Sequence, residues 1–288
     1  MTLEARLVLA LLEGVVTGSV LALTALGLSL IFGVMRIVNV AHGEFFMLGA
    51  VVAWSVASTT SSFGLALLAA PVAVGGVALV ANRVLLRPVR YEPHATIVAT
   101  AGLLYILQQT VLSLYGPYAR TVAAPFYARI DLPWFGYSAY KLAVAGVAAV
   151  LLWLAWRIVS GTTLGLYMRA TQQDPEIAQA FGVPIYRVYA AAFALGAALA
   201  GIAGALVTPI QPAHYLMGLD ALLASFTVVI VGGLGNLGGT LAAAFLIGLS
   251  DGLVSVFFSP TLARIVSTLL VAFVLVFRPG GLFGGDSA

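Results

Sequence analysis

The sequence predicts an all-α polytopic integral membrane protein with about eight or nine transmembrane helices, some of them broken or re-entrant. The first observation is composition: 62% of the 288 residues are hydrophobic and 8% are charged, against roughly 25% charged residues in soluble domains. The 13 Lys and Arg residues and 10 Asp and Glu residues are too few to cover the surface of a water-soluble protein of this length. The second observation is that charge-free apolar stretches of bilayer-spanning length, about 20 residues each, recur along the chain. Residues 1–288 are therefore expected to form a single transmembrane domain.

Composition and motifs also exclude several classes of protein. The chain has no cysteine, which excludes disulfides, thiolate metal sites and cysteine nucleophiles together. The net charge is only +3, without a cluster of Lys or Arg, so the sequence does not predict nucleic-acid binding. His42, His94 and His214 lie far apart and no HExxH pattern occurs, so we expect no metal site.

The first apolar stretches predict three membrane helices. Residues 14–35 are too long for the hydrophobic region of a signal peptide, so we expect this segment to be retained as a membrane helix. No charge occurs between Glu44 and Arg83, a run that is long enough for two helices. The polar residues 58–64 interrupt this run, which therefore predicts a helical hairpin.

Six further apolar stretches complete the set, at residues 95–115, 139–156, 187–208, 217–234, 238–257 and 262–277. Lys and Arg favour the cytoplasmic side of a membrane, so their distribution in a nine-helix arrangement indicates its orientation. One side holds Arg36, Arg83, Arg87, Arg90, Arg157, Arg169, Arg187 and Arg278, and the other holds Arg6, Arg120, Arg129, Lys141 and Arg264. The larger set is expected in the cytoplasm, which places the amino terminus outside and the carboxyl terminus inside.

Two polar connections are long enough to have a structure of their own. The outer one, residues 115–138, is rich in turn-forming and aromatic residues and is expected to form a short cap at the membrane surface. The inner one, residues 160–186, is expected to be partly helical. Asp174 followed by Pro175 predicts a helix start, because Asp is a favoured N-cap and Pro a favoured first residue. Gly182 predicts the end of that helix.

Glycine, with 31 residues, is expected to play two roles. In residues 196–205 small residues recur at helical spacing, which indicates tight helix packing in lipid and no substrate role. Residues 232–239 hold too many glycines to sustain a stable helix and are predicted to form a hinge at Gly232, Gly233, Gly235, Gly238 and Gly239. This hinge is either a helix broken at membrane depth beside a wet cavity or a cytoplasmic hairpin between two spans.

Arg36, Asn39, His42 and Glu44 form a polar cluster at the entry to an apolar stretch. Polar or charged residues that enter a membrane span are functional candidates. His42 and Glu44 are two positions apart and face different sides of a helix, so they do not form a metal pair by themselves. The structural alternative is an ion pair between Arg36 and Glu44 at the helix entry.

Several sequence blocks resemble a known family. Residues 26–50, LGLSLIFGVMRIVNVAHGEFFMLGA, look like the amino-terminal signature of the LivH-type permeases of branched-chain amino acid ABC importers. Blocks at residues 165–187, 231–239 and 278–284 agree with the same family in the expected order. The resemblance implies an all-helical subunit in a bacterial inner membrane. Its implied partners are a LivM-type permease, two cytoplasmic ATPases and a periplasmic solute-binding protein.

The resemblance also implies that the inner connection docks on the ATPase, the alternative being a solvated connector. The coupling residues carried over by position are Arg169, Ala170, Asp174, Glu176, Ala178, Gly182 and Arg187. The chain has no GxxxxGK[ST] motif, and its only lysine, Lys141, is not preceded by the glycines of such a motif. We therefore expect ATP and Mg on the partner ATPases and no cofactor on this chain.

An amino acid zwitterion that crosses the membrane needs polar partners along its path. The candidates inside apolar stretches are Asn39, His42, Glu44, Thr100, Gln108 and Thr227. Asp251 lies within the stretch 238–257, where a carboxylate is costly. We expect it to be paired, protonated or close to the membrane surface.

The function implied by the resemblance is the permease subunit of an ATP-binding cassette importer for branched-chain or related small amino acids. Two alternatives remain open: a permease of the same family for urea or short amides, and an ATP-independent secondary transporter or channel. The sequence disfavours an intramembrane enzyme, because it presents no nucleophile and base constellation.

Overall fold

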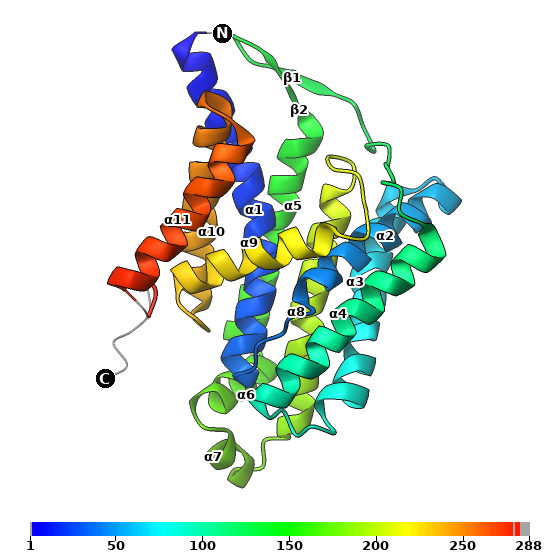
Figure 1. Ribbon diagram of the computed structural model, residues 1–288, viewed down its shortest axis with the longest axis vertical. Helices are drawn as coiled ribbons and strands as arrows, with labels where there is room; N and C mark the ends of the chain where they lie inside the picture. The colour runs from blue at the N-terminus through cyan, green and yellow to red at the C-terminus, as the bar shows by residue number, and fades with distance from the viewer. Residues whose placement is uncertain (1, 279, 283–288) are drawn as a thin grey trace.

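The computed structural model describes residues 2–278 and 280–282 of the chain. In chain order the elements are α1 (Leu3–Met35), α2 (His42–Thr60), α3 (Phe63–Ala81), the π-helical turn η1 (Asn82–Leu86), α4 (Pro93–Tyr115), β1 (Arg129–Asp131), β2 (Gly136–Ser138), α5 (Ala139–Gly161), α6 (Thr163–Gln173), α7 (Pro175–Ala180), α8 (Ile185–Val207), α9 (Met217–Gly232), α10 (Leu237–Phe257) and α11 (Pro260–Phe277). Most of the long helices follow the long axis of the molecule (Figure 1). The all-α class is confirmed, and the antiparallel hairpin of β1 and β2 is an addition that the sequence does not predict. Residues 279 and 283–284 of the last family-like block lie outside the described residues.

All nine predicted apolar stretches are helices, but two of them fall short of a membrane span. Seven helices of the described chain are long and apolar enough to cross, namely α1, α3 with η1, α4, α5, α8, α10 and α11. α9 has only 16 residues and lies across the other helices (Figure 1). α2 begins with His42 and Glu44 and ends in polar residues, which lowers its mean hydropathy. By length and composition, seven of the nine predicted stretches are therefore candidate spans in the described residues.

α1 lies at the centre of the bundle and packs against α8 and α10. Glycines let these helices approach closely: a methyl group at Gly27 would lie 2.3 Å from the carbonyl oxygen of Gly196. α2 reaches α8 in the same way, since a methyl group at Gly49 would lie 2.0 Å from the carbonyl oxygen of Gly201. Close packing of small residues holds helices together where lipid surrounds them. The prediction that residues 196–205 serve helix packing is confirmed.

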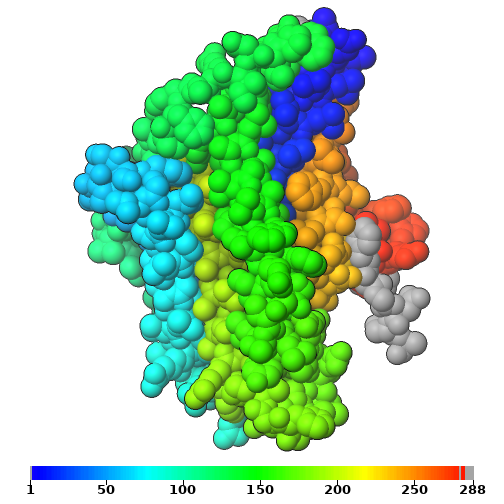
Figure 2. All heavy atoms as spheres, turned by 180° about the vertical axis from the view of Figure 1, so that it is seen from behind, coloured from blue at the N-terminus to red at the C-terminus, as the bar shows by residue number. Residues whose placement is uncertain are grey.

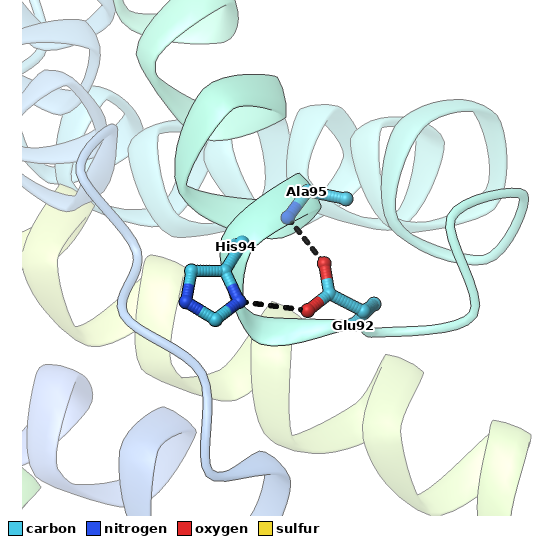
Figure 3. A network of polar contacts seen from close by, with 3 residues as sticks. All are labelled: Glu92, His94 and Ala95. Carbon is cyan, nitrogen blue, oxygen red and sulfur yellow. Dashed lines mark hydrogen bonds and ion pairs between the residues drawn. The ribbon is translucent and has the colours of Figure 1, made fainter.

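A carboxylate sets the start of α4. Oε2 of Glu92 accepts a hydrogen bond from the backbone nitrogen of Ala95 at 2.6 Å, and Oε1 lies 3.0 Å from Nδ1 of His94 (Figure 3). Because these hydrogen bonds favour the charged carboxylate, with the Ala95 bond contributing most, the pKa of Glu92 lies below its usual range. Pro93, the first residue of the helix, has no N–H that would need a partner.

The two ends of the bundle carry different structures. β1, β2 and the amino-terminal end of α1 lie at one end, whereas α6 and α7 lie at the other (Figure 1). Between α4 and β1 the chain is mostly irregular, and Arg120 exchanges two backbone hydrogen bonds with Ala213, at 2.8 and 2.7 Å. Seen from behind, α3, α8 and α5 stand side by side along the bundle (Figure 2). The two predicted polar connections thus lie at opposite ends of the molecule.

Candidate functional site

A cluster of buried polar side chains lies where α2 begins. Glu44 is 1% exposed, and its Oε1 accepts a hydrogen bond from Nε2 of Gln108 on α4 at 3.0 Å. The carboxylate also packs against Gly218 in the first turn of α9, where a methyl group would lie 2.7 Å from the carboxylate atoms. Glu44 therefore joins α2, α4 and α9 at one point inside the protein.

The helix starts around Glu44 explain how a carboxylate is accommodated there. Glu44 belongs to the first turn of α2 and faces the first turn of α9 across Gly218. The backbone N–H groups and the dipole make the start of a helix electropositive, so both helices favour a negative charge at this point. Gly43 permits the approach, because a methyl group there would lie 1.9 Å from the carbonyl oxygen of Gly218.

Three further predicted path residues belong to the same cluster. Oδ1 of Asn39 accepts a hydrogen bond from the backbone nitrogen two residues later, at 3.1 Å. Oγ1 of Thr100 accepts one from a backbone nitrogen of the segment 36–41, at 3.2 Å. Nε2 of His42 lies 2.9 Å from the carbonyl oxygen of Thr24 on α1. Together with Glu44 and Gln108, five of the six predicted path residues thus lie around the start of α2, where each makes at least one hydrogen bond to a protein group.

Arg36 does not belong to this cluster, and the alternative of an ion pair between Arg36 and Glu44 is wrong. Nη2 of Arg36 donates to the carbonyl oxygens of Gln172 and Gln173 at the end of α6, at 3.0 and 3.3 Å. Arg36 ends α1 in a left-handed conformation with φ +54°. The chain then runs on without helical structure to α2, which separates the guanidinium from the buried carboxylate.

Thr227, the sixth predicted path residue, lies instead in a groove of about 750 Å³ between α1, α5, α9, α10 and α11. Uncharged polar side chains line part of the groove, among them Thr17, Thr24, Gln211, Ser225, Thr227, Ser267 and Thr268. Thr24 belongs to the groove wall and also accepts the contact from His42 through its carbonyl oxygen. The buried cluster therefore lies directly behind one wall of the groove.

Two ion pairs line the same groove and were not predicted. Nζ of Lys141 lies 2.6 Å from Oε1 of Glu13. Nη1 of Arg264 lies 4.0 Å from Oδ1 of Asp220. Each pair joins helices that are distant in the sequence, α1 with α5 and α9 with α11, so no local pattern reveals it. The only available signal was that these charges sit at the ends of apolar stretches.

Asp251 also lines the groove. It accepts a hydrogen bond from Oγ of Ser267 on α11 and is partly exposed. Of the three expectations for this carboxylate, pairing is the one that the structure bears out, with a hydroxyl as the partner. Access to the groove also lowers the cost of placing the charge within a membrane helix.

At the opposite end, the connection between α5 and α8 is helical, as predicted. Oδ1 of Asp174 accepts hydrogen bonds from the backbone nitrogens of Glu176 and Ile177, both at 2.9 Å, and caps α7. Gly182 has φ +86° and lies after the end of α7. The predicted start and end of this helix are confirmed. Arg169 on α6 donates to the carbonyl oxygen of Val159, which ties α6 to the last turns of α5.

The end of α6 contacts two other parts of the chain through Gln172, a residue that the sequence did not single out. Its carbonyl oxygen accepts from Arg36 at the end of α1, and its Nε2 donates to the carbonyl oxygen of Gly235 at 3.3 Å. Gly235 itself packs on α1, because a methyl group there would lie 3.0 Å from Cα of Gly33. α1, α6 and the glycine-rich turn therefore meet at one junction.

The glycine-rich segment forms a turn between two helices, so the predicted break in helical structure is present. α9 ends at Gly232, and Gly233 and Gly235 adopt positive φ values of 97° and 78°. Oδ1 of Asn236 accepts a hydrogen bond from the backbone nitrogen of Gly239 at 2.9 Å and caps α10. The last two glycines of the predicted hinge thus belong to the first turn of α10. Because α9 is too short to span, the turn does not join two full crossings.

Within the described residues, no group of three or more His, Asp or Glu side chains is arranged to hold a metal ion. The polar groups therefore offer hydrogen bonds and fixed charges. In the groove, acidic and basic side chains lie near one another, an arrangement suited to a ligand that carries both charges.

Comparison with known proteins identifies relatives along nearly the whole chain. A family model described as the permease component of the branched-chain amino acid transport system matches residues 10–275. The LivH high-affinity branched-chain amino acid transport system permease protein of Escherichia coli K12 is 29% identical over 292 residues, covering 94% of each chain. The BraD permease protein of Pseudomonas aeruginosa is 25% identical, covering 95% of this chain and 94% of BraD. A probable LivH protein of Methanocaldococcus jannaschii is 26% identical, covering 96% and 92%. No solved structure matches.

Proposed function

The chain belongs to the family of branched-chain amino acid transport permease components, and from that premise we propose that it is the membrane subunit of an ATP-binding cassette importer. Its solute is a branched-chain or related small amino acid. The observation that carries this proposal is the junction at Gln172, which links the α6–α7 segment to the turn between α9 and α10. Both α9 and α10 line the groove.

The groove supports the proposed solute class. An amino acid zwitterion carries a carboxylate and an ammonium group close together. In the groove, the cations Lys141 and Arg264 lie beside the acids Glu13 and Asp220, and Asp251 supplies a further carboxylate. Urea and short amides carry no charge, so these charges favour the amino acid over that alternative. We assign the groove as the outer part of the translocation path.

The α6–α7 segment supports the proposed coupling. It lies at the end of the bundle opposite β1 and β2 (Figure 1), and the cap at Asp174 gives it a defined helical form. Arg169 ties it to α5, and Gln172 ties it to Gly235. A push on this segment would reach α9 and α10 through the turn, because both helices are anchored there. Arg169, Ala170, Asp174, Glu176, Ala178, Gly182 and Arg187 are the proposed ATPase-coupling residues.

The energy source lies outside this chain. The sequence has no GxxxxGK[ST] phosphate-binding loop, so ATP and Mg are proposed to bind two partner ATPases. The other proposed partners are a second permease subunit and an extracytoplasmic solute-binding protein. The larger number of Arg residues on the side of the bundle that holds α6 and α7 supports a bacterial inner-membrane orientation with these helices in the cytoplasm. The amino terminus is then outside.

Reconstitution tests the proposed function. In proteoliposomes, the chain together with its second permease, both ATPases and the binding protein is expected to accumulate radiolabelled leucine only when ATP is present. The chain alone is expected to accumulate none. Gradient-driven leucine uptake by the chain alone would favour an ATP-independent transporter, and uptake of urea without leucine uptake would overturn the solute class.

A further inference from the structure

A second cavity, of about 600 Å³, opens between the end of α3, the π-turn η1, α7 and the start of α8. It lies apart from the groove, and Arg187 is the one proposed coupling residue that lines it. Leu79, Val183 and Ala190 form part of an apolar wall. The cavity is also basic, because Arg83, Arg87 and Arg187 all line it.

The three arginines have no acidic partner. Among the residues that the structure describes, no carboxylate lies within ion-pair distance of Arg83, Arg87 or Arg187. Arg87 stacks over the ring of Tyr186, with its guanidinium carbon 5.3 Å from the ring centroid. Three uncompensated positive charges around one cavity create a strongly positive potential, which favours an anionic ligand.

The local backbone places these charges. η1 is a π-helical turn from Asn82 to Leu86, and the backbone nitrogen of Arg87 bonds to the carbonyl oxygen of Asn82 five residues earlier, at 2.9 Å. π-turns are rare and often mark functional sites. α8 begins beside the cavity without a side-chain cap, so its electropositive start adds to the attraction for an anion.

A buried donor inside the cavity wall gives an independent sign of a ligand. Asn82 lines the cavity and is only 3% exposed. Its Oδ1 accepts a hydrogen bond from the hydroxyl of Tyr91 at 3.2 Å, whereas its Nδ2 has no partner among the described residues. Buried polar groups are nearly always satisfied. The unpaired Nδ2 therefore marks a place beside the cavity where a partner group is missing.

The surroundings of the cavity identify the membrane as the source of the anion. α3 exposes a row of aliphatic side chains that leads to the cavity, with Val72 76%, Val80 63% and Leu79 48% exposed. In a membrane helix such a row faces acyl chains, and it stops where Arg83 begins the charged region. This transition from apolar side chains to arginines is where the phosphates of a lipid leaflet lie.

We propose that this basic cavity binds the phosphate headgroup of an anionic phospholipid. Arg83, Arg87 and Arg187 surround the phosphate, beside Asn82. The acyl chains lie along the exposed aliphatic face of α3. The bound lipid fixes the end of α3 against the start of α8, next to the α6–α7 segment.

Native mass spectrometry of the delipidated, purified chain tests the proposal. The wild-type chain is expected to retain phosphatidylglycerol in preference to phosphatidylcholine with identical acyl chains. Near a membrane each arginine contributes about fivefold to the affinity for anionic lipid, so the double variant Arg83→Gln with Arg187→Gln is expected to lose roughly 30-fold. A wild-type chain without preference, or a double variant that keeps the preference, would overturn the proposal.

Matched variants separate lipid binding from loss of fold. Arg157→Gln removes an exposed arginine at the end of α5, outside the cavity, and is expected to keep the wild-type preference. Arg83→Lys with Arg187→Lys keeps the charges and is expected to retain most of the preference. Equal loss in the Arg157 variant would show that net charge, and not the cavity, selects the lipid.

Two further experiments distinguish a lipid from other groups that could occupy the basic cavity. Glycerol 3-phosphate and inorganic phosphate are expected not to displace the bound phosphatidylglycerol, because they lack acyl chains. Displacement at similar affinity would overturn the assignment to a lipid. Phosphatidylglycerol is also expected to stay bound after the ATPases are added. If they expel it, the arginines form a protein-docking face instead.

Discussion

Replacing Gly235 with alanine tests the junction between the glycine-rich turn and the α6–α7 segment. Gly235 has φ +78°, and a methyl group there would lie 3.0 Å from Cα of Gly33. Its carbonyl oxygen accepts the hydrogen bond from Nε2 of Gln172. Because Gly33 contributes backbone and no side chain at this contact, the turn itself must move, and the hydrogen bond to Gln172 weakens.

The geometry gives the magnitude of the effect. A left-handed conformation costs a non-glycine residue roughly 1–2 kcal/mol, and the close contact with Gly33 raises the cost of Gly235→Ala to about 2 kcal/mol. Such a cost reduces the population of the native turn roughly 30-fold. Gly238→Ala is the matched control, because its methyl group would have its nearest neighbour at 3.6 Å, the side chain of Asn236. In the first turn of α10, alanine is expected to be neutral or mildly favourable.

The assay uses the complete transporter in proteoliposomes, with ATP hydrolysis and leucine uptake measured together. Gly235→Ala is expected to lower the uptake per ATP hydrolysed and the melting temperature of the complex. Gly238→Ala is expected to match the wild type in both. If Gly235→Ala also matches the wild type, or if both variants lose coupling equally, the junction does not transmit motion in the way proposed.

Three further predictions follow from the contacts. Arg169→Glu breaks the contact between α6 and α5 and reverses a charge on the coupling segment, so we expect ATP hydrolysis without uptake; wild-type uptake would exclude the coupling role. Gly218→Ala places a methyl group 2.7 Å from the carboxylate of Glu44, so overpacking by roughly 1–3 kcal/mol should lower the melting temperature, and an unchanged melting temperature would contradict the packing described. The lowered pKa of Glu92 means that its charged cap on α4 stabilises the fold above the ordinary glutamate pKa, and that this contribution is lost as the pH falls through the lowered value. Glu92→Gln should therefore remove part of the acid sensitivity of thermal unfolding at pH values below the ordinary glutamate pKa, whereas an identical pH profile would refute the role of the cap.

Much of the architecture could be predicted because membrane helices and helix caps depend on local sequence. Apolar stretches with few charges located nine of the helices, and Asp174 with Gly182 located α7. The number of candidate crossings was less predictable. Whether an apolar helix such as α9 crosses the membrane or lies across its neighbours depends on tertiary packing, which its composition does not encode.

The groove could not be predicted from the sequence, because it too depends on tertiary packing. Lys141 meets Glu13 only because α5 packs on α1, and nothing near either residue indicates the other. The same holds for Gln172, an ordinary residue in its own helix, which becomes important only because Arg36 and Gly235 reach it. The polar residues in the first turn of α2 were noticed for their sequence position, and the structure shows them facing protein groups.

The central proposal is that the groove is a solute path that opens and closes with ATP on the partner subunits. Because the chain has no cysteine, Thr227→Cys introduces a unique label site in the groove, and Tyr118→Cys introduces a control on the outer connection, where Tyr118 is 75% exposed. The measurement is the rate of modification by a membrane-impermeant maleimide, in complete transporters with cysteine-free partners, without nucleotide and with ATP trapped on the ATPases. We predict that the rate at position 227 changes by about tenfold or more between the two states, the effect of a population shift of about 1.4 kcal/mol, and that the rate at position 118 stays constant. Equal rates at position 227 in both states would contradict the proposal.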